Sequence, residues 1–222
     1  MNIHRPAAYL FDLDGTLVDG FRAIQASVNH VRLHRGLTPL PLDAVRAAVG
    51  RGLRKLMELT IPVGDVEANC AIFETHHPGV IAAGTDVLPG VFDTLNALHA
   101  SGAKLGVCSN KPLSLIHEVL QATKLAPFFS SVFGPERVPR PKPAPDMLLG
   151  ALEELGVSTS ESLYVGDMTI DVETGRSAGV EVWVIPSGTQ SREVLAASSP
   201  QRILDDFPDL LTASFPAGSD SN

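Results

Sequence analysis

The chain has 222 residues, 44% hydrophobic and 19% charged, so it is long enough to bury a core of its own. Its formal net charge of -8 argues against a broad nucleic-acid surface, which would need clustered lysine and arginine side chains. Residues 1–6 lack a basic stretch leading into an apolar one, and no segment reaches the ~18 apolar residues of a membrane span. We therefore expect a cytoplasmic protein with no nucleic-acid or membrane partner.

Short apolar runs that end in polar or glycine residues predict strands buried on both faces, at 7–11, 105–108, 163–165 and 180–185. Helical patterns lie between these runs, at 91–99, 113–123 and 145–155. Strands that alternate with helices indicate an α/β fold built on a doubly wound parallel sheet. In such a fold, ligands bind at the carboxyl ends of the strands.

An inserted unit interrupts this alternation. Helical patterns follow one another with no strand between them, at 21–33, 42–49, 53–59 and 65–76. We expect a core of residues 1–18 and 85–222 and a helical cap of residues 19–84, although helices that only pad one edge of the core fit the same pattern. Glycines in Asp19-Gly20 and in 79–85 would let a two-strand hinge bend. Residues 212–222 lack an apolar period and are expected to be disordered.

Aspartates follow two of the predicted strands. Asp12 and Asp14 come after the first apolar run, and Asp167 and Asp171 come after the run at 163–165. An ionised carboxylate at the end of a buried strand is costly unless a cation or hydrogen bonds compensate it. Helix capping or a turn explains one such pair equally well, but two pairs together indicate a magnesium phosphotransfer site.

The chemistry of such a site assigns a role to each residue. Asp12 is the candidate nucleophile, and Asp14, two residues on, is the candidate general acid and base. Ser109 and Asn110 end the run at 105–108, where they can bind phosphate oxygens, and Lys142 can supply positive charge. Two alternatives remain open: Ser109 could simply cap the following helix, and Lys142 could be an ordinary solvated lysine. The two cysteines, Cys70 and Cys108, are read as reduced core thiols, with a nucleophilic Cys108 as the alternative.

Taken together, Asp12-Leu13-Asp14-Gly15-Thr16, Ser109-Asn110, Lys142 and Gly166-Asp167 with Asp171 resemble the four motifs of the haloacid dehalogenase superfamily in type and order. The resemblance implies a Rossmann-like core, an aspartyl-phosphate intermediate and Mg²⁺. It makes Asp12 a nucleophile and metal ligand, and Asp14 an acid and base whose carbonyl binds the metal. Asp167 would be a further ligand, Asp171 a ligand or an outer-shell acceptor, and Ser109 and Lys142 would hold the phosphate. The helical insertion resembles the small cap of this superfamily.

Within the superfamily, the presence of Asp14 favours a phosphatase over a dehalogenase. The basic turn at 50–55 resembles the cap specificity loop of phosphoglycolate phosphatase-like members, so Arg51 is a candidate for binding a carboxylate such as that of glycolate. A solvated helix start explains this turn as well. The expected substrate is a small phosphate ester, and the expected assembly is a monomer or a homodimer. One departure is Gly20, since phosphatases of this kind often have Ser or Thr after the aspartate.

Three alternatives stay open. A mutase of the β-phosphoglucomutase type shares these motifs, and a phosphonoacetaldehyde hydrolase would use a cap lysine, here Lys55, as a Schiff base in a desolvated pocket. The third alternative is a phosphate-sensing domain without turnover, which would have little need for Asp14. His76-His77 is interpreted as a polar helix end outside the site.

Overall fold

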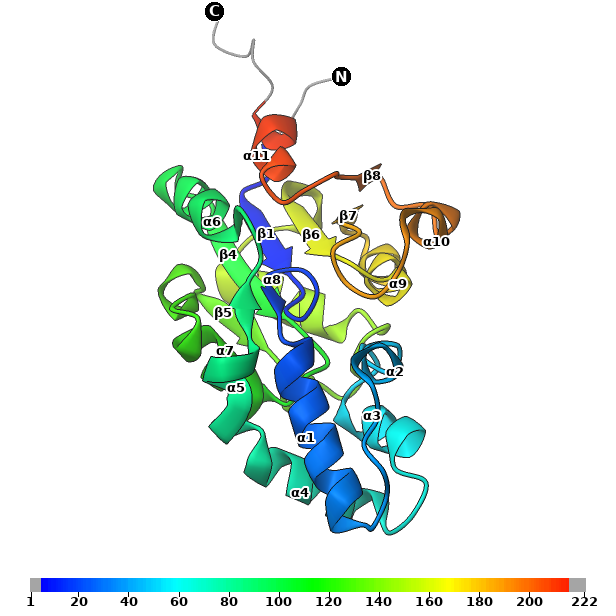
Figure 1. The fold of residues 1–222 in the computed structure, drawn as a ribbon. Helices are drawn as coiled ribbons and strands as arrows, with labels where there is room; N and C mark the ends of the chain where they lie inside the picture. Colours follow the sequence, from blue (N-terminus) through cyan, green and yellow to red (C-terminus); the bar gives the residue numbers. More distant parts are fainter. Residues whose placement is uncertain (1–4, 216–222) are drawn as a thin grey trace, which may run out of the picture.

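The computed structural model describes residues 5–215 and places a six-stranded sheet at the centre of the core (Figure 1). Its strands are β1 (Ala8–Phe11), β4 (Lys104–Cys108), β5 (Ser131–Phe133), β6 (Ser162–Gly166), β7 (Glu181–Val184) and β8 (Arg202–Ile203). Their order is β5-β4-β1-β6-β7-β8, and all neighbours are parallel. The parallel α/β fold predicted from the sequence is confirmed.

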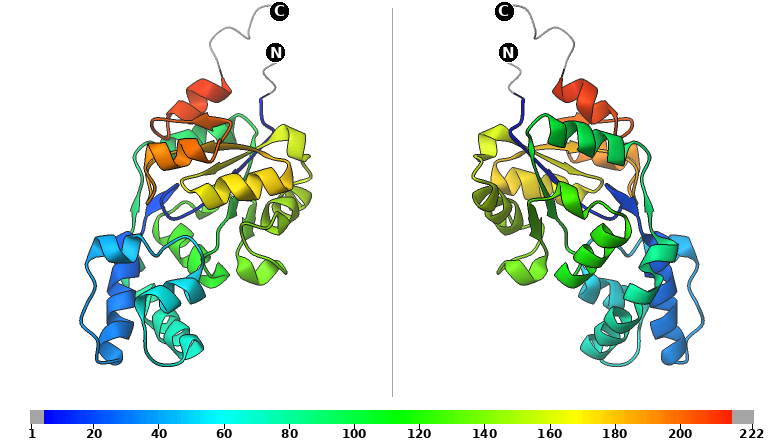
Figure 2. Two further views of the ribbon diagram at one scale, coloured as in Figure 1. Left: turned by 90° about the vertical axis from the view of Figure 1, so that its right-hand side faces the viewer. Right: turned by 90° about the vertical axis from the view of Figure 1, so that its left-hand side faces the viewer.

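Helices cover both faces of this sheet (Figure 2). On one face lie α6 (Val91–Ala100), α7 (Leu113–Ala122) and α11 (Asp209–Ser214), and on the other lie α8 (Asp146–Leu155), α9 (Thr169–Ala178) and α10 (Arg192–Ala197). Short 3₁₀ turns occur at Ala126–Phe128, Pro135–Arg137 and Thr159–Glu161. Side chains along β1 point alternately to the two faces of the sheet. Phe11 packs in the hydrophobic cluster of Leu95 on one face, and Leu10 packs in the cluster of Leu148 on the other.

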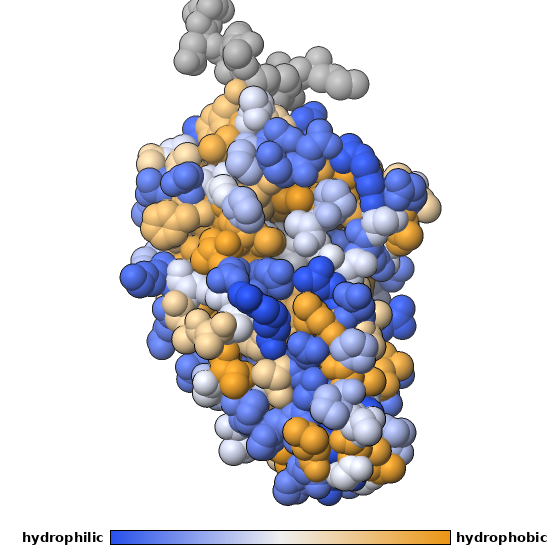
Figure 3. Space-filling model, in the orientation of Figure 1, coloured by the Kyte–Doolittle hydropathy of each residue, from blue (hydrophilic) through white to orange (hydrophobic). Residues whose placement is uncertain are grey.

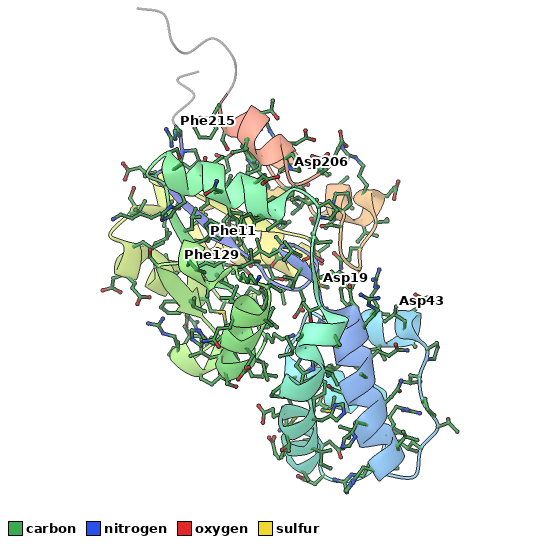
Figure 4. All side chains as sticks on the ribbon, turned by 60° about the vertical axis from the view of Figure 1, so that its left-hand side comes forward. Phe11, Asp19, Asp43, Phe129, Asp206 and Phe215 are labelled. Carbon is green, nitrogen blue, oxygen red and sulfur yellow. The ribbon has the colours of Figure 1, made fainter. Side chains whose placement is uncertain are left out.

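Five further helices, which we call the cap, lie between the short strands β2 (Val18–Asp19) and β3 (Asp86–Val87). They are α1 (Phe21–His34), α2 (Leu42–Arg46), α3 (Leu53–Thr60), α4 (Val66–His76) and α5 (Pro78–Gly84). β2 and β3 pair antiparallel, and Asp19 is labelled in Figure 4 where the chain passes from the core into the cap. The cap has its own hydrophobic cluster, which includes Leu115 of α7 from the core.

Two expectations about irregular segments are corrected by the structure. Most of the glycine-bearing flank at 79–85 is helical, because Ile81 is buried and Gly84 lets α5 approach the backbone of Ala23. The disorder expected from residue 212 is wrong up to Ser214, where α11 ends after burying Leu210. Residues 216–222 of that predicted tail lie outside the described residues.

The surface mixes polar and apolar side chains over both the core and the cap (Figure 3). The large hydrophobic side chains that are exposed come from separate segments of both parts, among them Leu33, Leu59, Phe92 and Val194. Within residues 5–215, none of the helices combines the length and the apolar composition that crossing a bilayer requires.

Candidate active site

The three central strands of the sheet each end at a predicted site residue. Asp12 follows β1, Ser109 follows β4 and Asp167 follows β6, and β1 pairs with both of the other two strands. Because the strands are parallel, their carboxyl ends lie at one edge of the sheet. Asp12, Ser109 and Asp167 are all buried there. The structure thus brings together side chains that lie far apart in the sequence.

Asp12, Asp167 and Asp171 form a cluster of carboxylates whose nearest oxygens all lie within 4.8 Å of one another. In Asp167, Oδ1 accepts a hydrogen bond from Thr16 Oγ1 at 3.0 Å, whereas Oδ2 is buried and has no hydrogen-bond partner among residues 5–215. A Cβ at Gly188 would lie 1.7 Å from this Oδ2 atom, so only glycine fits the loop that closes over it. A buried carboxylate oxygen without a donor is where a cation would be most favourable.

Asp171 is satisfied by the protein itself. Its Oδ2 accepts the backbone N–H groups of Asp167 and Met168, at 3.2 Å and 3.0 Å. Its Oδ1 accepts the hydroxyl of Tyr164 and the ammonium of Lys142, both at 2.8 Å. With both oxygens occupied, Asp171 is suited to orienting Asp167 and Lys142 as an outer-shell acceptor.

Lys142 is the buried counter-ion of the cluster. Its Nζ lies 3.0 Å from Asp12 Oδ1 and 2.8 Å from Asp171 Oδ1, with only 1% of the side chain exposed. Burial alone lowers the pKa of Lys142, but the two carboxylates outweigh burial and raise that pKa above its usual value. Lys142 therefore stays charged, and its burial excludes the solvated surface lysine that the sequence also allowed.

One lysine does not balance three carboxylates. Burial raises the pKa of Asp12 to about 6, with Lys142 opposing the rise and Asp171 adding to it. Burial, then the charges of Asp12 and Asp171, raises the pKa of Asp167 well above its usual value. A divalent cation among these oxygens would favour the ionised carboxylates. The donor set of carboxylate oxygens also matches the hard oxygen ligands that Mg²⁺ prefers, so the residues present fit this ion.

Asn110 has a role that the sequence did not indicate. Its Oδ1 accepts the N–H of Lys142 at 3.0 Å, and its Nδ2 donates to the carbonyl of Lys142 at 3.1 Å and to that of Gly50 at 3.3 Å. The amide expected to bind phosphate therefore holds the main chain of Lys142 and contacts the cap. The hydroxyl of Ser109 accepts only the backbone N–H of Lys111, at 3.4 Å, and keeps its own proton for a ligand.

Lys111 is the main site residue that sequence reasoning missed. Its Nζ lies 2.9 Å from Asp14 Oδ2, and the two side chains are only 8% and 9% exposed. The one signal in the sequence was its position directly after Ser109-Asn110. Asp14 is thus held by its own cation and stands apart from the cluster of the other three carboxylates.

A cleft of about 50 Å³ lies between the core and the cap, and its polar lining is Asp12, Asp14, Ser109, Asn110 and Lys111. A buried water needs roughly 10–15 Å³ of such space, so the cleft holds only a few waters.

Two basic residues of the cap lie outside the cleft. Arg51 is exposed and is absent from the cleft lining, so its expected contact with a substrate stays a prediction. Gly50 and Gly52, both with positive φ, turn their backbone toward the core on either side of it. Lys55 is paired with Glu58 at 3.1 Å and is 44% exposed, so it lacks the desolvated pocket that a Schiff-base lysine needs.

Cys108 and His77 are buried for structural reasons. The thiol of Cys108 donates to the carbonyl of Met147 at 3.6 Å, and burial raises its pKa, which keeps it protonated and unsuited to act as a nucleophile. His77 lies 2.9 Å from the hydroxyl of Ser27. Burial and the charge of Lys111 lower the pKa of His77 to about 3, so this ring is neutral.

A parallel α/β core, an acidic cluster at the carboxyl edge of its sheet and an inserted helical cap together define a capped α/β protein with a candidate cation site. The chain belongs to the haloacid dehalogenase-like hydrolases, whose family model matches residues 9–185. A crystal structure described as a predicted phosphoglycolate phosphatase from Haemophilus somnus superposes with a TM-score of 0.90 at 26% identity, covering 97% of this chain and 100% of the other.

Curated relatives share more of the sequence. A phosphoglycolate phosphatase of Pseudomonas putida is 34% identical over 220 residues, which covers 93% of this chain and 79% of that protein. A phosphoglycolate phosphatase of Rhodospirillum rubrum is 35% identical over 216 residues, which covers 92% of this chain and 89% of that protein. The family resemblance carried by the four motifs is thereby confirmed.

Proposed function

We propose that this protein is a Mg²⁺-dependent phosphatase that hydrolyses a small phosphomonoester through an aspartyl-phosphate on Asp12. The observation that carries the proposal is the placement of Asp12 and Asp14 on one cleft, with Lys142 Nζ 3.0 Å from Asp12 Oδ1. A nucleophilic carboxylate and a second carboxylate for proton transfer are the two groups that this reaction needs.

The reaction has two steps. In the first, an oxygen of Asp12 bonds to phosphorus, the bond from phosphorus to the ester oxygen breaks, and Asp14 gives its proton to the departing alcohol. In the second, Asp14 takes a proton from water as the water oxygen bonds to phosphorus. The bond from phosphorus to Asp12 then breaks and releases inorganic phosphate. Ser109 would donate to a phosphoryl oxygen, and Lys142, whose Nζ lies 3.0 Å from Asp12 Oδ1, would offset the negative charge of Asp12 and of the phosphoryl group.

Asp12, Asp167 and the main-chain carbonyl of Asp14 would hold Mg²⁺, with Asp171 supporting them from the outer shell. The unpartnered Oδ2 of Asp167 and the raised pKa values of Asp12 and Asp167 support this choice of ligands. When bound, the ion supplies positive charge that offsets the repulsion between the carboxylates and the phosphate dianion.

Phosphoglycolate is the first candidate substrate, because relatives of that name are 34% and 35% identical to this chain. The exposed position of Arg51 leaves its expected contact with the glycolate carboxylate without structural support. We therefore look for a partner of that carboxylate among the residues that line the cleft.

The test is the release of inorganic phosphate from a panel of phosphomonoesters that includes phosphoglycolate and sugar phosphates, with Mg²⁺ or with a chelator. We expect metal-dependent release by the parent protein and by Asp93→Asn, a control on the exposed surface of α6. Asp12→Asn should abolish release. Turnover that persists in Asp12→Asn, or that ignores the chelator, would refute the mechanism.

Asp14→Asn separates an enzyme from a phosphate-sensing domain. In an enzyme, this variant should lose phosphate release while it still binds a phosphate ester. A sensing domain would bind ligand equally well with either residue and release no phosphate with either. Isomerisation of a sugar phosphate by the parent protein would instead support the mutase alternative.

A further inference from the structure

The cap side of the cleft is apolar. Its side chains there are those of Ile24, Val49, Leu53, Leu56 and Phe73, accompanied by the backbone of Gly50 and Gly52. Within residues 5–215, Lys111 is the one basic residue that lines the cleft, since the buried ammonium of Lys142 is paired with Asp12 and Asp171. An anionic group on a substrate in the cleft could therefore pair with one lining cation, that of Lys111, which belongs to the core.

The ammonium of Lys111 has donors to spare. It has three N–H donors, and in this structure its hydrogen bond goes to Asp14 Oδ2 at 2.9 Å. Its side chain is 8% exposed, so an ion pair formed there is little weakened by water. The basic residues of the cap turn have no comparable position, because Arg54 and Lys55 are more exposed and pair with Glu58.

The position of Lys111 beside Asp14 defines which part of a substrate it can reach. Under the proposed function, on which this inference rests, Asp14 protonates the ester oxygen of the leaving alcohol. A cation bound to Asp14 then lies next to the atoms attached to that oxygen. In a 2-hydroxy acid ester such as phosphoglycolate, a single methylene separates the ester oxygen from the carboxylate, which therefore falls beside the Lys111 ammonium.

We propose that Lys111 is the specificity-determining residue of this site and that it binds a carboxylate on the leaving alcohol. The apolar cap wall then closes over the remaining face of a small substrate and excludes water from the ion pair. The hydrogen bond to Asp14 keeps the ammonium directed into the cleft before the substrate arrives.

The test compares 2-phosphoglycolate with its neutral carboxamide, 2-phosphoglycolamide, which keeps the shape and loses the charge. The parent protein should prefer the carboxylate in kcat/KM by about 10- to 100-fold, as expected for one charge-assisted hydrogen bond. Lys111→Gln should lose the preference, mainly through a higher KM for phosphoglycolate, and Lys111→Arg should keep part of it. Lys55→Gln, which removes an exposed lysine of the cap, should leave the preference unchanged.

A loss of activity in Lys111→Gln that is equal for both substrates would overturn the proposal, because Lys111 would then only hold Asp14. Equal use of both substrates by the parent protein would overturn it too. Binding to Asp12→Asn, measured by calorimetry with and without Lys111→Gln, gives a readout that needs no turnover. Suppose that Asp12→Asn binds the carboxylate ester more tightly than the carboxamide, that Lys111→Gln removes this difference, and that the parent protein releases phosphate from no ester. The proposed function then fails and the assignment of Lys111 stands.

Discussion

The side chain of Asn110 holds the main chain of Lys142 on both sides, accepting its N–H at 3.0 Å and donating to its carbonyl at 3.1 Å. The same side chain also donates to the carbonyl of Gly50 in the cap. Asn110 therefore links the position of the buried lysine to the contact between cap and core. A displacement of about 1 Å in a reacting group can reduce a rate roughly 100-fold, so this link should matter for turnover.

We expect Asn110→Ala to lower kcat by about 10- to 100-fold, because Lys142 loses its fixed position beside Asp12. The chain offers a matched control in the cap, where Asn29 binds the main chain of Leu40 through the same two hydrogen bonds. Asn29→Ala should cost stability without a comparable loss of kcat. Steady-state kinetics and thermal unfolding of both variants check this, and equal kcat losses would argue against the assignment.

Gly20 fits closely against Asp14. A Cβ at residue 20 would lie 2.6 Å from Asp14 Oδ1, so Gly20→Ala must displace that carboxylate. We expect kcat to fall by about 10-fold or more, because general acid and base catalysis depends on position. Gly79→Ala is the control, since within residues 5–215 its new Cβ would meet no atom within 4 Å beyond its chain neighbours and the backbone of its own helix. Unchanged kcat in Gly20→Ala would show that Asp14 tolerates displacement.

Removal of the Lys142 ammonium should destabilise the fold as well as abolish activity. Lys142→Met leaves the buried carboxylates of Asp12 and Asp171 without their cation, which costs about 3–5 kcal/mol for such a pair. Lys55→Met removes an exposed lysine paired with Glu58 and should cost about 1 kcal/mol or less. Denaturant unfolding without metal measures both values, and similar losses would contradict this reasoning.

The stability of the metal-free protein should depend on pH through Asp12. Its pKa of about 6 in the folded protein lies above its usual value near 3.8, so the folded state binds this proton more tightly than the unfolded state. The contribution of Asp12 to the free energy of unfolding is fully present at low pH and is lost as the pH rises from about 4 to about 6. Asp12→Asn should remove this loss, which is on the order of 1–3 kcal/mol.

The measurement is the free energy of unfolding at several pH values with a chelator, taken as the difference between the parent protein and Asp12→Asn. This difference cancels the titration of carboxylates remote from Asp12, whereas Asp167, whose pKa the charge of Asp12 helps to raise, contributes to it. A difference that does not vary between pH 4 and 7 would mean that Asp12 carries its usual pKa.

Mg²⁺ should raise the melting temperature of the parent protein at neutral pH, because binding to the folded state alone stabilises it. Asp167→Asn should reduce this shift, since it removes the buried oxygen that lacks a partner. The exposed control Asp93→Asn should keep the full shift. A thermal scan with increasing Mg²⁺ checks the three proteins, and an equal shift in all of them would exclude Asp167 as a ligand.

The sequence predicted the central strands from their short apolar runs and most helices from their hydrophobic period. The strands β5 and β8 were missed, since segments of 3 and 2 residues at the edges of the sheet contain no measurable period. The helix α5 was missed because its two glycines are unfavourable in a helix. Its helical form depends on the burial of Ile81 and on close contact with α1.

By itself, the sequence determined the parallel α/β core and the chemical groups of the site, because strand periodicity and aspartates at strand ends are local features. Asp12, Asp167 and Lys142 could therefore be named before any contact was known. The tertiary structure decided the surroundings of each polar side chain. Lys111 pairs with Asp14, Asn110 binds the main chain of Lys142, and Arg51 is exposed to solvent. These outcomes depend on burial and on distances between remote segments, which set electrostatic energies and which no local pattern encodes.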